Sequence, residues 1–333
     1  IGGWDVSQVT TMNSIFSQAE SFNQDLSDWD VDKVEDNYSN FAEDSGFASY
    51  DHFWPIFRYL EIENKNELID FINQIDEDGR YGGFLMNHWN VSQIYDMSDL
   101  IKSTNQKNTF NYRIKNWDVS QVTTMNNMFS QAIIFNQNIG GWNVGKVTDM
   151  SVIFGDAYVF NQDIGSWDVG KVNNMYSMFF EANAFNYNIG DWDVSQVTNM
   201  NSMFSQAHSF NQDIGDWNVS QVTDIKLMFY QATAFNQDIG SWNVGEVNDM
   251  GAMFSQAESF NQDIGDWTID KVTNIRLMFY QAESFNQNIG KWNVGKVTNM
   301  HEIFFDAVSF NQDIGDWNVS QVNDMDGMLK MQL

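Results

Sequence analysis

Residues 192–216 read WDVSQVTNMNSMFSQAHSFNQDIGD, and close variants of this 25-residue stretch fill most of the 333-residue chain. Tryptophans recur at an unbroken 25-residue interval from Trp117 to Trp317, and Trp4 and Trp29 keep the same spacing. Trp89 begins a unit that is lengthened to 28 residues. A fixed period of this length is typical of a solenoid, in which each unit buries its apolar side only against its neighbours. The sequence therefore predicts one repeat array of about twelve coils.

Each unit contains two hydrophobic periods. Trp192 and Val194 alternate with Asp193, which is typical of a short half-buried strand. The apolar residues that follow fall at spacings of three, three, one, three and three, as Val197, Met200, Met203, Phe204, Ala207 and Phe210. This spacing favours one face of an α-helix, which would be capped by a Ser, Asp or Gly. The prediction is an α/β repeat solenoid that resembles a leucine-rich repeat, with one short parallel strand and one helix per coil.

The repeat fails between residues 38 and 87. This stretch holds the only proline, Pro55, and an aromatic run from Phe53 to Tyr59, and its spacing predicts a helix over 64–75. We expect solenoid coils at 1–37, a helical insertion at 38–87 and continuous coils at 88–333. Insertions in repeat arrays often carry binding. The candidate contact residues of the insertion are Phe53, Trp54, Phe57 and Tyr59.

Charge and composition narrow the classes of partner. Forty-five acidic and sixteen basic residues give a net charge of −29, which argues against a nucleic-acid partner. The chain has no cysteine and no stretch of 18 apolar residues, so thiolate metal sites and a membrane span in this segment are excluded. The segment 74–79, QIDEDG, fails the spacing of a calcium loop. We therefore predict no metal site, although weak divalent cation binding is expected from the charge.

Catalytic motifs are absent from the sequence. The four histidines lie in unrelated contexts, and neither a zinc-binding HExxH motif nor a nucleophile elbow nor a glycine-rich phosphate loop occurs. The repeat gives most carboxylates equivalent surroundings, whereas acid–base catalysis needs surroundings that separate pKa values. The prediction is a protein that is not an enzyme, with no catalytic residue and no cofactor.

Two polar positions recur in the units. The Asn after Phe occurs ten times, and we interpret it as a ladder whose amides bond turn backbones in adjacent coils. The residue between Trp and Val is almost always Asp or Asn, although both are poor strand formers. Its exposed side chains would either bind a glycan, peptide or cation or keep the sheet face from aggregating. The candidate binding row on the sheet face is Asp5, Asp118, Asn143, Asp168, Asp193, Asn218, Asn243, Asn293 and Asn318.

The pattern WxVSxVTxMxxMFxxAxxFNQxIGxW resembles the BspA-like leucine-rich-repeat surface proteins with 25-residue mycoplasma-type repeats. It matches residues 117–324 throughout, 1–37 well and 88–116 loosely, whereas the insertion at 38–87 departs from it. The resemblance implies a secreted or cell-surface, non-enzymatic protein associated with adhesion and protein–protein contact. It carries over no ligand residues.

Two functions are expected from these features. The first is an extracellular or cell-surface repeat protein that binds a protein or glycan through its acidic sheet face or its insertion. The alternative is a structural subunit that stacks head to tail on copies of itself into an extracellular filament. Solenoid ends normally carry polar caps, and neither end of this sequence has a polar cap. The first expected strand begins at Trp4, and the last expected helix ends with apolar side chains: Met328, Leu329, Met331 and Leu333.

Overall fold

The computed structural model describes residues 1–26, 29–31, 33–34, 41–42, 45, 59–77, 79–82 and 84–331. They belong to two compact units, one of residues 1–62 with 74–91 and one of residues 63–73 with 92–333. The predicted contact residues Phe53, Trp54 and Phe57 lie outside the described residues. Tyr59 is described, and its side chain is exposed.

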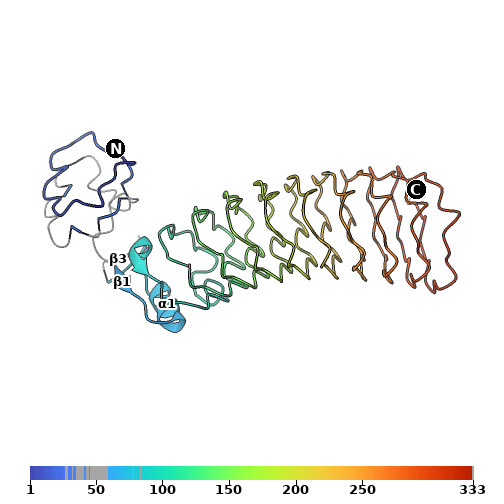
Figure 1. Ribbon diagram of the computed structural model, residues 1–333, viewed down its shortest axis with the longest axis horizontal. Coiled ribbons are helices and arrows are strands. Elements are labelled where there is room, and N and C mark those ends of the chain that lie inside the picture. Colours follow the sequence, from blue (N-terminus) through green and yellow to red (C-terminus); the bar gives the residue numbers. More distant parts are fainter. Residues whose placement is uncertain are drawn as a thin grey trace. The chain divides into compact units, whose positions relative to one another are not determined.

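The second unit is a repeat solenoid, which confirms the coarse prediction. Figure 1 shows its coils, from green to red, following one another along one axis. Isolated parallel bridges join consecutive coils at one position, beginning with Asp96 to Thr124 and ending with Asn299 to Asp324. Each coil is therefore hydrogen-bonded to its neighbours at the same place.

The core repeats with the coils. In the coil 192–216 the side chains with at most 4% exposure include Trp192, Val194, Val197, Met200, Met203, Phe204, Ala207, Phe210 and Ile214. Phe204 and Phe210 stack with ring centroids 3.9 Å apart, and Phe204 stacks on Phe229 of the next coil at 5.8 Å. Full burial of each Val, Ile, Met or Phe side chain contributes about 1.5–3 kcal/mol. Apolar and aromatic stacking between neighbours therefore dominates the stability of the array.

The predicted helix over 197–210 is wrong, because this segment is a series of tight turns. Alternate N–H groups donate to carbonyls of the next coil: Met200 to Asp224, Ser202 to Lys226, Phe204 to Met228 and Gln206 to Tyr230. The N–H groups between them donate three residues back, as Met203 does to Met200 and Ala207 does to Phe204. Ser202 and Gln206 adopt left-handed φ values of 57° and 60°. Both sets of hydrogen bonds are incompatible with an α-helix.

The spacing of the coils explains why turns replace helices. An α-helix with side chains is about 10–12 Å across, whereas hydrogen-bonded chains lie about 4.8 Å apart. Helices cannot stack at that interval. Three-residue turns place apolar side chains at the same three-residue spacing and keep the coils within hydrogen-bonding distance. The observed spacing of apolar residues is therefore compatible with an α-helix and with a series of three-residue turns.

The predicted strand also lies elsewhere. Trp192–Val194 is not a strand; the bridge residue of this coil is Asn199, which pairs with Asn174 and Asp224. An Asx turn at Asp193 bends the chain at the expected strand, since the Ser195 N–H donates to Asp193 Oδ1 over 3.0 Å.

The second unit begins with helix α1, Lys65–Ile72, close to the helix predicted over 64–75. The Asn64 side chain caps it by accepting the Glu67 N–H, and Leu68 and Ile72 are buried. Lys65 Nζ lies 3.2 Å from Asp96 Oδ2, and the Asn105 N–H donates to Asn73 Oδ1 over 2.8 Å. These contacts attach α1 to the coil that follows it.

The first unit contains the shorter named elements. Strand β1, Leu60–Glu61, pairs in parallel with β4, Trp89–Asn90, and β2, Arg80–Tyr81, pairs antiparallel with β3, Phe84–Leu85. The 3₁₀-helix η2, Met86–His88, joins β3 to β4. A separate apolar cluster gathers Val6, Met12, Leu26, Trp29, Val31, Val34, Phe41 and Ala42. None of the helices among the described residues has the length and apolarity needed to cross a bilayer.

Candidate ligand-binding surface

The residues between Trp and Val form a continuous exposed row on the second unit. We call this row the Asx ridge. It consists of Asp118, Asn143, Asp168, Asp193, Asn218, Asn243, Asn293 and Asn318, with Thr268 at the same position in one coil, and all are exposed. Because consecutive coils are hydrogen-bonded in a 25-residue register, the side chains lie side by side. Asp5 is equally exposed on the first unit.

The ridge is not part of a sheet, contrary to the prediction. Each of its Asp and Asn residues accepts, through Oδ1, the backbone N–H two residues further on, as Asn218 does from Ser220 over 3.2 Å. Asp5 accepts from Ser7 in the same way. This Asx turn explains the choice of poor strand formers here. Protection of a sheet face from aggregation does not apply, since no sheet face lies here.

The charge of the ridge varies along the array. Its three carboxylates, Asp118, Asp168 and Asp193, lie on its amino-terminal half, and amides occupy the remaining positions apart from Thr268. Hydrogen bonds from the side chain and backbone of Ser195 lower the pKa of Asp193, and Ser7 lowers the pKa of Asp5 in the same way. The turn therefore favours the ionised carboxylate. It leaves a second oxygen or an amide nitrogen on each side chain for contacts outside the turn.

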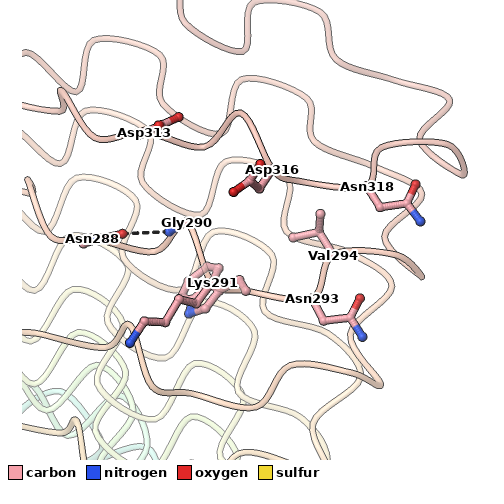
Figure 2. Close-up of a pocket in the computed structure, with 9 residues that line it drawn as sticks. Asn288, Gly290, Lys291, Asn293, Val294, Asp313, Asp316 and Asn318 are labelled. Carbon is pink, nitrogen blue, oxygen red and sulfur yellow. Dashed lines mark hydrogen bonds between the residues drawn. The ribbon is translucent and has the colours of Figure 1, made fainter.

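A groove of about 620 Å³ adjoins the ridge between its last two coils. Asn293 and Asn318 border it, together with Asn288, Gly290, Lys291, Trp292, Val294, Asp313 and Asp316. Figure 2 shows the Asn293 and Asn318 amides extending in the same direction from consecutive coils. The Asn293 amide also donates to Asp270 Oδ1 over 2.7 Å.

The polar groups of the groove suit recognition of a polar ligand. Lys291 Nζ lies 3.5 Å from Asp266 Oδ1 with both side chains largely exposed, so this ion pair is weak and the ammonium group is accessible. Asp313 Oδ1 accepts the Gly315 N–H over 2.9 Å, which fixes its carboxylate in a turn. A cation, carboxylates and amides therefore lie around one cavity. The described residues contain no group of three or more His, Asp or Glu able to hold a metal ion.

The sequence pattern predicted the exposed row of the ridge, but it did not predict the groove beside it. Lys291 precedes a repeat Trp, a position that holds Gly, Ser, Asp, Asn or His in the other units, and Asp316 holds the same position in the next unit. Lys291 is the one lysine at this position, and such a variation in a uniform repeat is the signal that could have drawn attention to the groove. Tyr59, on the first unit, is the only predicted insertion contact among the described residues.

Comparison with known proteins identifies the family. Residues 1–78, 84–186, 160–267 and 253–332 match the family described as Mycoplasma protein of unknown function, DUF285. The chain belongs to this family. The stretch 38–87 was predicted to depart from the family. The matched segments nevertheless include most of it, residues 38–78 and 84–87.

No curated protein matches the DUF285 chain. A solved structure titled as the crystal structure of a TLR13–ssRNA13 complex is similar over 76% of this chain and 41% of that chain, at 9% identity and a TM-score of 0.28. The chain thus spans less than half the length of that protein.

Proposed function

We propose that this chain is a non-enzymatic, BspA-like extracellular or cell-surface protein that mediates adhesion by binding a protein or glycan through the Asx ridge. The observation that carries this proposal is the continuous row of exposed Asp and Asn side chains, each held by the same turn. Side chains that are already ordered lose little conformational entropy on binding. A row of equivalent contacts also suits a repetitive ligand, whose second contact forms intramolecularly.

The proposal includes no catalytic step. The ridge carboxylates are all exposed and share one turn geometry, which lowers the pKa of Asp193, whereas a carboxyl that acts as a general acid at neutral pH needs surroundings that raise its pKa. The proposed partner is therefore bound and released without chemical change.

The test replaces ridge residues by the residue that one coil already carries at this position. Thr268 occupies the ridge position in an intact coil, so the triple change Asp193→Thr, Asn218→Thr and Asn243→Thr retains a tolerated side chain. Screening the purified chain on glycan and surface-protein arrays identifies ligands, and we expect the triple variant to bind them at least about tenfold more weakly because ligand contacts are lost. The control changes Ser209, Ser284 and Ser309 to Thr, at exposed positions about half a coil away. Ligand binding that survives the triple change in a folded chain would reject the ridge as the site.

The alternative proposal, a filament subunit, is favoured by apolar exposure in the last coil. Val319, Met325, Leu329 and Met331 are all exposed there. Either a further coil or a second copy would cover them. Light scattering across a salt and Ca²⁺ series distinguishes the proposals: growing filaments support the alternative, and uniform particles of about 38.5 kDa reject it.

A further inference from the structure

A second cavity lies about half a coil away from the Asx ridge. We call it the glutamine groove. It has a volume of about 380 Å³, a floor of Gln231, Gln256 and Gln281, and a rim of His208, Thr233, Glu258 and Glu283. Its volume falls at the lower end of the range of about 300–1,000 Å³ that is usual for ligand pockets.

The floor is an amide ladder that keeps unused hydrogen-bonding capacity. Gln231 Nε2 donates to Gln256 Oε1, and Gln256 Nε2 donates to Gln281 Oε1 over 2.7 Å. The backbone N–H groups of Gln231 and Gln256 are held by carbonyls of the next coil. A primary amide has two N–H donors and two acceptor lone pairs, and the ladder uses one of each on Gln256. The floor can therefore accept further hydrogen bonds.

The rim is anionic, and its backbone is hydrogen-bonded between coils. Ser259 Oγ donates to the Thr233 carbonyl over 2.6 Å, and the Ser284 N–H donates to the Glu258 carbonyl over 3.2 Å, which links consecutive coils. Glu258 and Glu283 occupy equivalent exposed positions in adjacent coils. Neither lysine nor arginine lines this cavity, which lies wholly within the described stretch 84–331.

This combination is confined to one part of the array. At the rim position the other coils of the stretch 117–316 carry Ile133, Tyr158, Asn183 and Val308, and at the floor position acids replace glutamine at Asp156, Glu181 and Asp306. Glu20 holds the rim position in the first unit. A repeat gives every coil the same chemistry except where a position varies. Paired rim carboxylates above a neutral amide floor are such a variation.

We propose that the glutamine groove binds the side-chain ammonium of lysine in an extended basic peptide. An ammonium group has three donors and no acceptor, so it needs several acceptors in one place. The carboxylates of Glu258 and Glu283 and the remaining lone pairs of the glutamine ladder provide them. The net charge of −29 attracts a basic peptide toward the surface before it docks. The lining contains no Phe, Tyr or Trp ring on which a sugar could stack.

The experiment is calorimetric titration of the full chain with a short end-blocked peptide of alternating Gly and Lys at about 150 mM salt, where long-range attraction is screened. The double change Glu258→Gln and Glu283→Gln keeps side-chain size and removes both rim charges. We expect it to weaken peptide binding at least about tenfold. The control, Asp191→Asn with Asp216→Asn, removes the same charge from exposed sites and should change binding less than about twofold.

Two further titrations identify the ligand chemistry. A peptide with acetylated lysines should not bind, because it lacks the ammonium charge, and the polyamine spermine should bind more weakly than the lysine peptide. Absence of peptide binding, equal losses in the two double variants, or tighter binding of spermine would each overturn the proposal. The Asx-ridge triple variant should bind the peptide as tightly as the unchanged chain does. The ridge proposal and the groove proposal are therefore tested independently.

Discussion

At the residue scale, short polar side chains satisfy the backbone of each coil. Asn211 Oδ1 accepts the Asn236 N–H over 2.9 Å and the Gln237 amide over 3.0 Å. The backbone bond recurs from Asn111 to Asn311, and the amide bond recurs except where Tyr187 replaces Gln. The structure thus confirms the asparagine ladder. Trp217 Nε1 donates to the Ile189 carbonyl of the preceding coil over 3.1 Å. Such bonds matter because a buried, unpaired backbone group costs about as much as a lost hydrogen bond.

The surroundings of Asp156 disfavour its ionised state. Burial, the charge of Glu181 and a hydrogen bond with Glu181 raise the pKa of Asp156 above its ordinary value of 3.8, while Lys102 opposes them. The folded chain therefore holds this proton more tightly than the unfolded chain does. The stability that Asp156 contributes is present below the unfolded pKa and is lost as the pH rises through the raised pKa.

We therefore predict that Asp156→Asn stabilises the chain at neutral pH but not at acidic pH, because it removes the repulsion from Glu181. Thermal unfolding of both proteins between pH 3.5 and 7.5 measures this, with a difference that grows as the pH rises. Asp193→Asn is the control, and it should destabilise the chain at neutral pH. The pKa of Asp193 is lowered, so the stability that its carboxylate contributes is lost as the pH falls. A difference for Asp156→Asn that is constant with pH would contradict the raised pKa.

At the element scale, tight turns bring consecutive coils very close together. A Cβ atom added to Gly140 would lie 2.2 Å from the Asp163 carbonyl oxygen of the next coil, and the corresponding distance for Gly215 and Asp238 is 2.6 Å. The neighbouring Gly141 has nothing within 4 Å of such an atom. The recurrent glycine is therefore required by the distance between coils.

Gly140→Ala should destabilise the chain by about 1–3 kcal/mol, because the backbone of two coils must separate. Gly141→Ala is the matched control and should be neutral or stabilising by up to about 1 kcal/mol, through a less flexible unfolded chain. Chemical denaturation monitored by tryptophan fluorescence measures both changes. Equal effects of the two substitutions would show that the close approach at Gly140 is not required.

At the scale of the whole molecule, the second unit is stabilised by contacts between adjacent coils. The Trp267, Trp292 and Trp317 rings stack at 6.5 Å intervals, and the bridges join only consecutive coils. In such an array the stability is approximately a sum over units and their interfaces. A whole coil is consequently a removable unit, whereas part of a coil is not.

Deletion of residues 192–216 should leave a folded chain of reduced stability, because Asp191 then precedes Trp217 in the correct register. Deletion of 192–204 leaves about half a coil that cannot pair fully with either neighbour, so the coils on its two sides should unfold as separate units. Near-ultraviolet circular dichroism of the tryptophans and thermal melting measure both outcomes. Unfolding of the whole-coil deletion would contradict a stability based on nearest neighbours.

The sequence by itself determined the features that depend on local pattern. The 25-residue period, the inward-facing Trp, Val, Met and Phe, the asparagine ladder and the helix near 64–75 all follow from which residues recur at which spacing. The exposure of the Asx ridge follows in the same way, because Asp193 lies between two buried residues. These features require only that neighbouring coils are alike.

Only the tertiary structure decided what the backbone does between those residues. Turns and helices give the same spacing of apolar side chains, and the choice depends on hydrogen bonds such as Ser202 to Lys226, which join residues 24 positions apart. The Asx turn at Asp193 and the bridge at Asn199 follow from that choice. The two grooves depend on which side chains adjacent coils place side by side. Contacts between coils determine the turns and the grooves, because each coil can bury its apolar side chains and pair its backbone only against its neighbours.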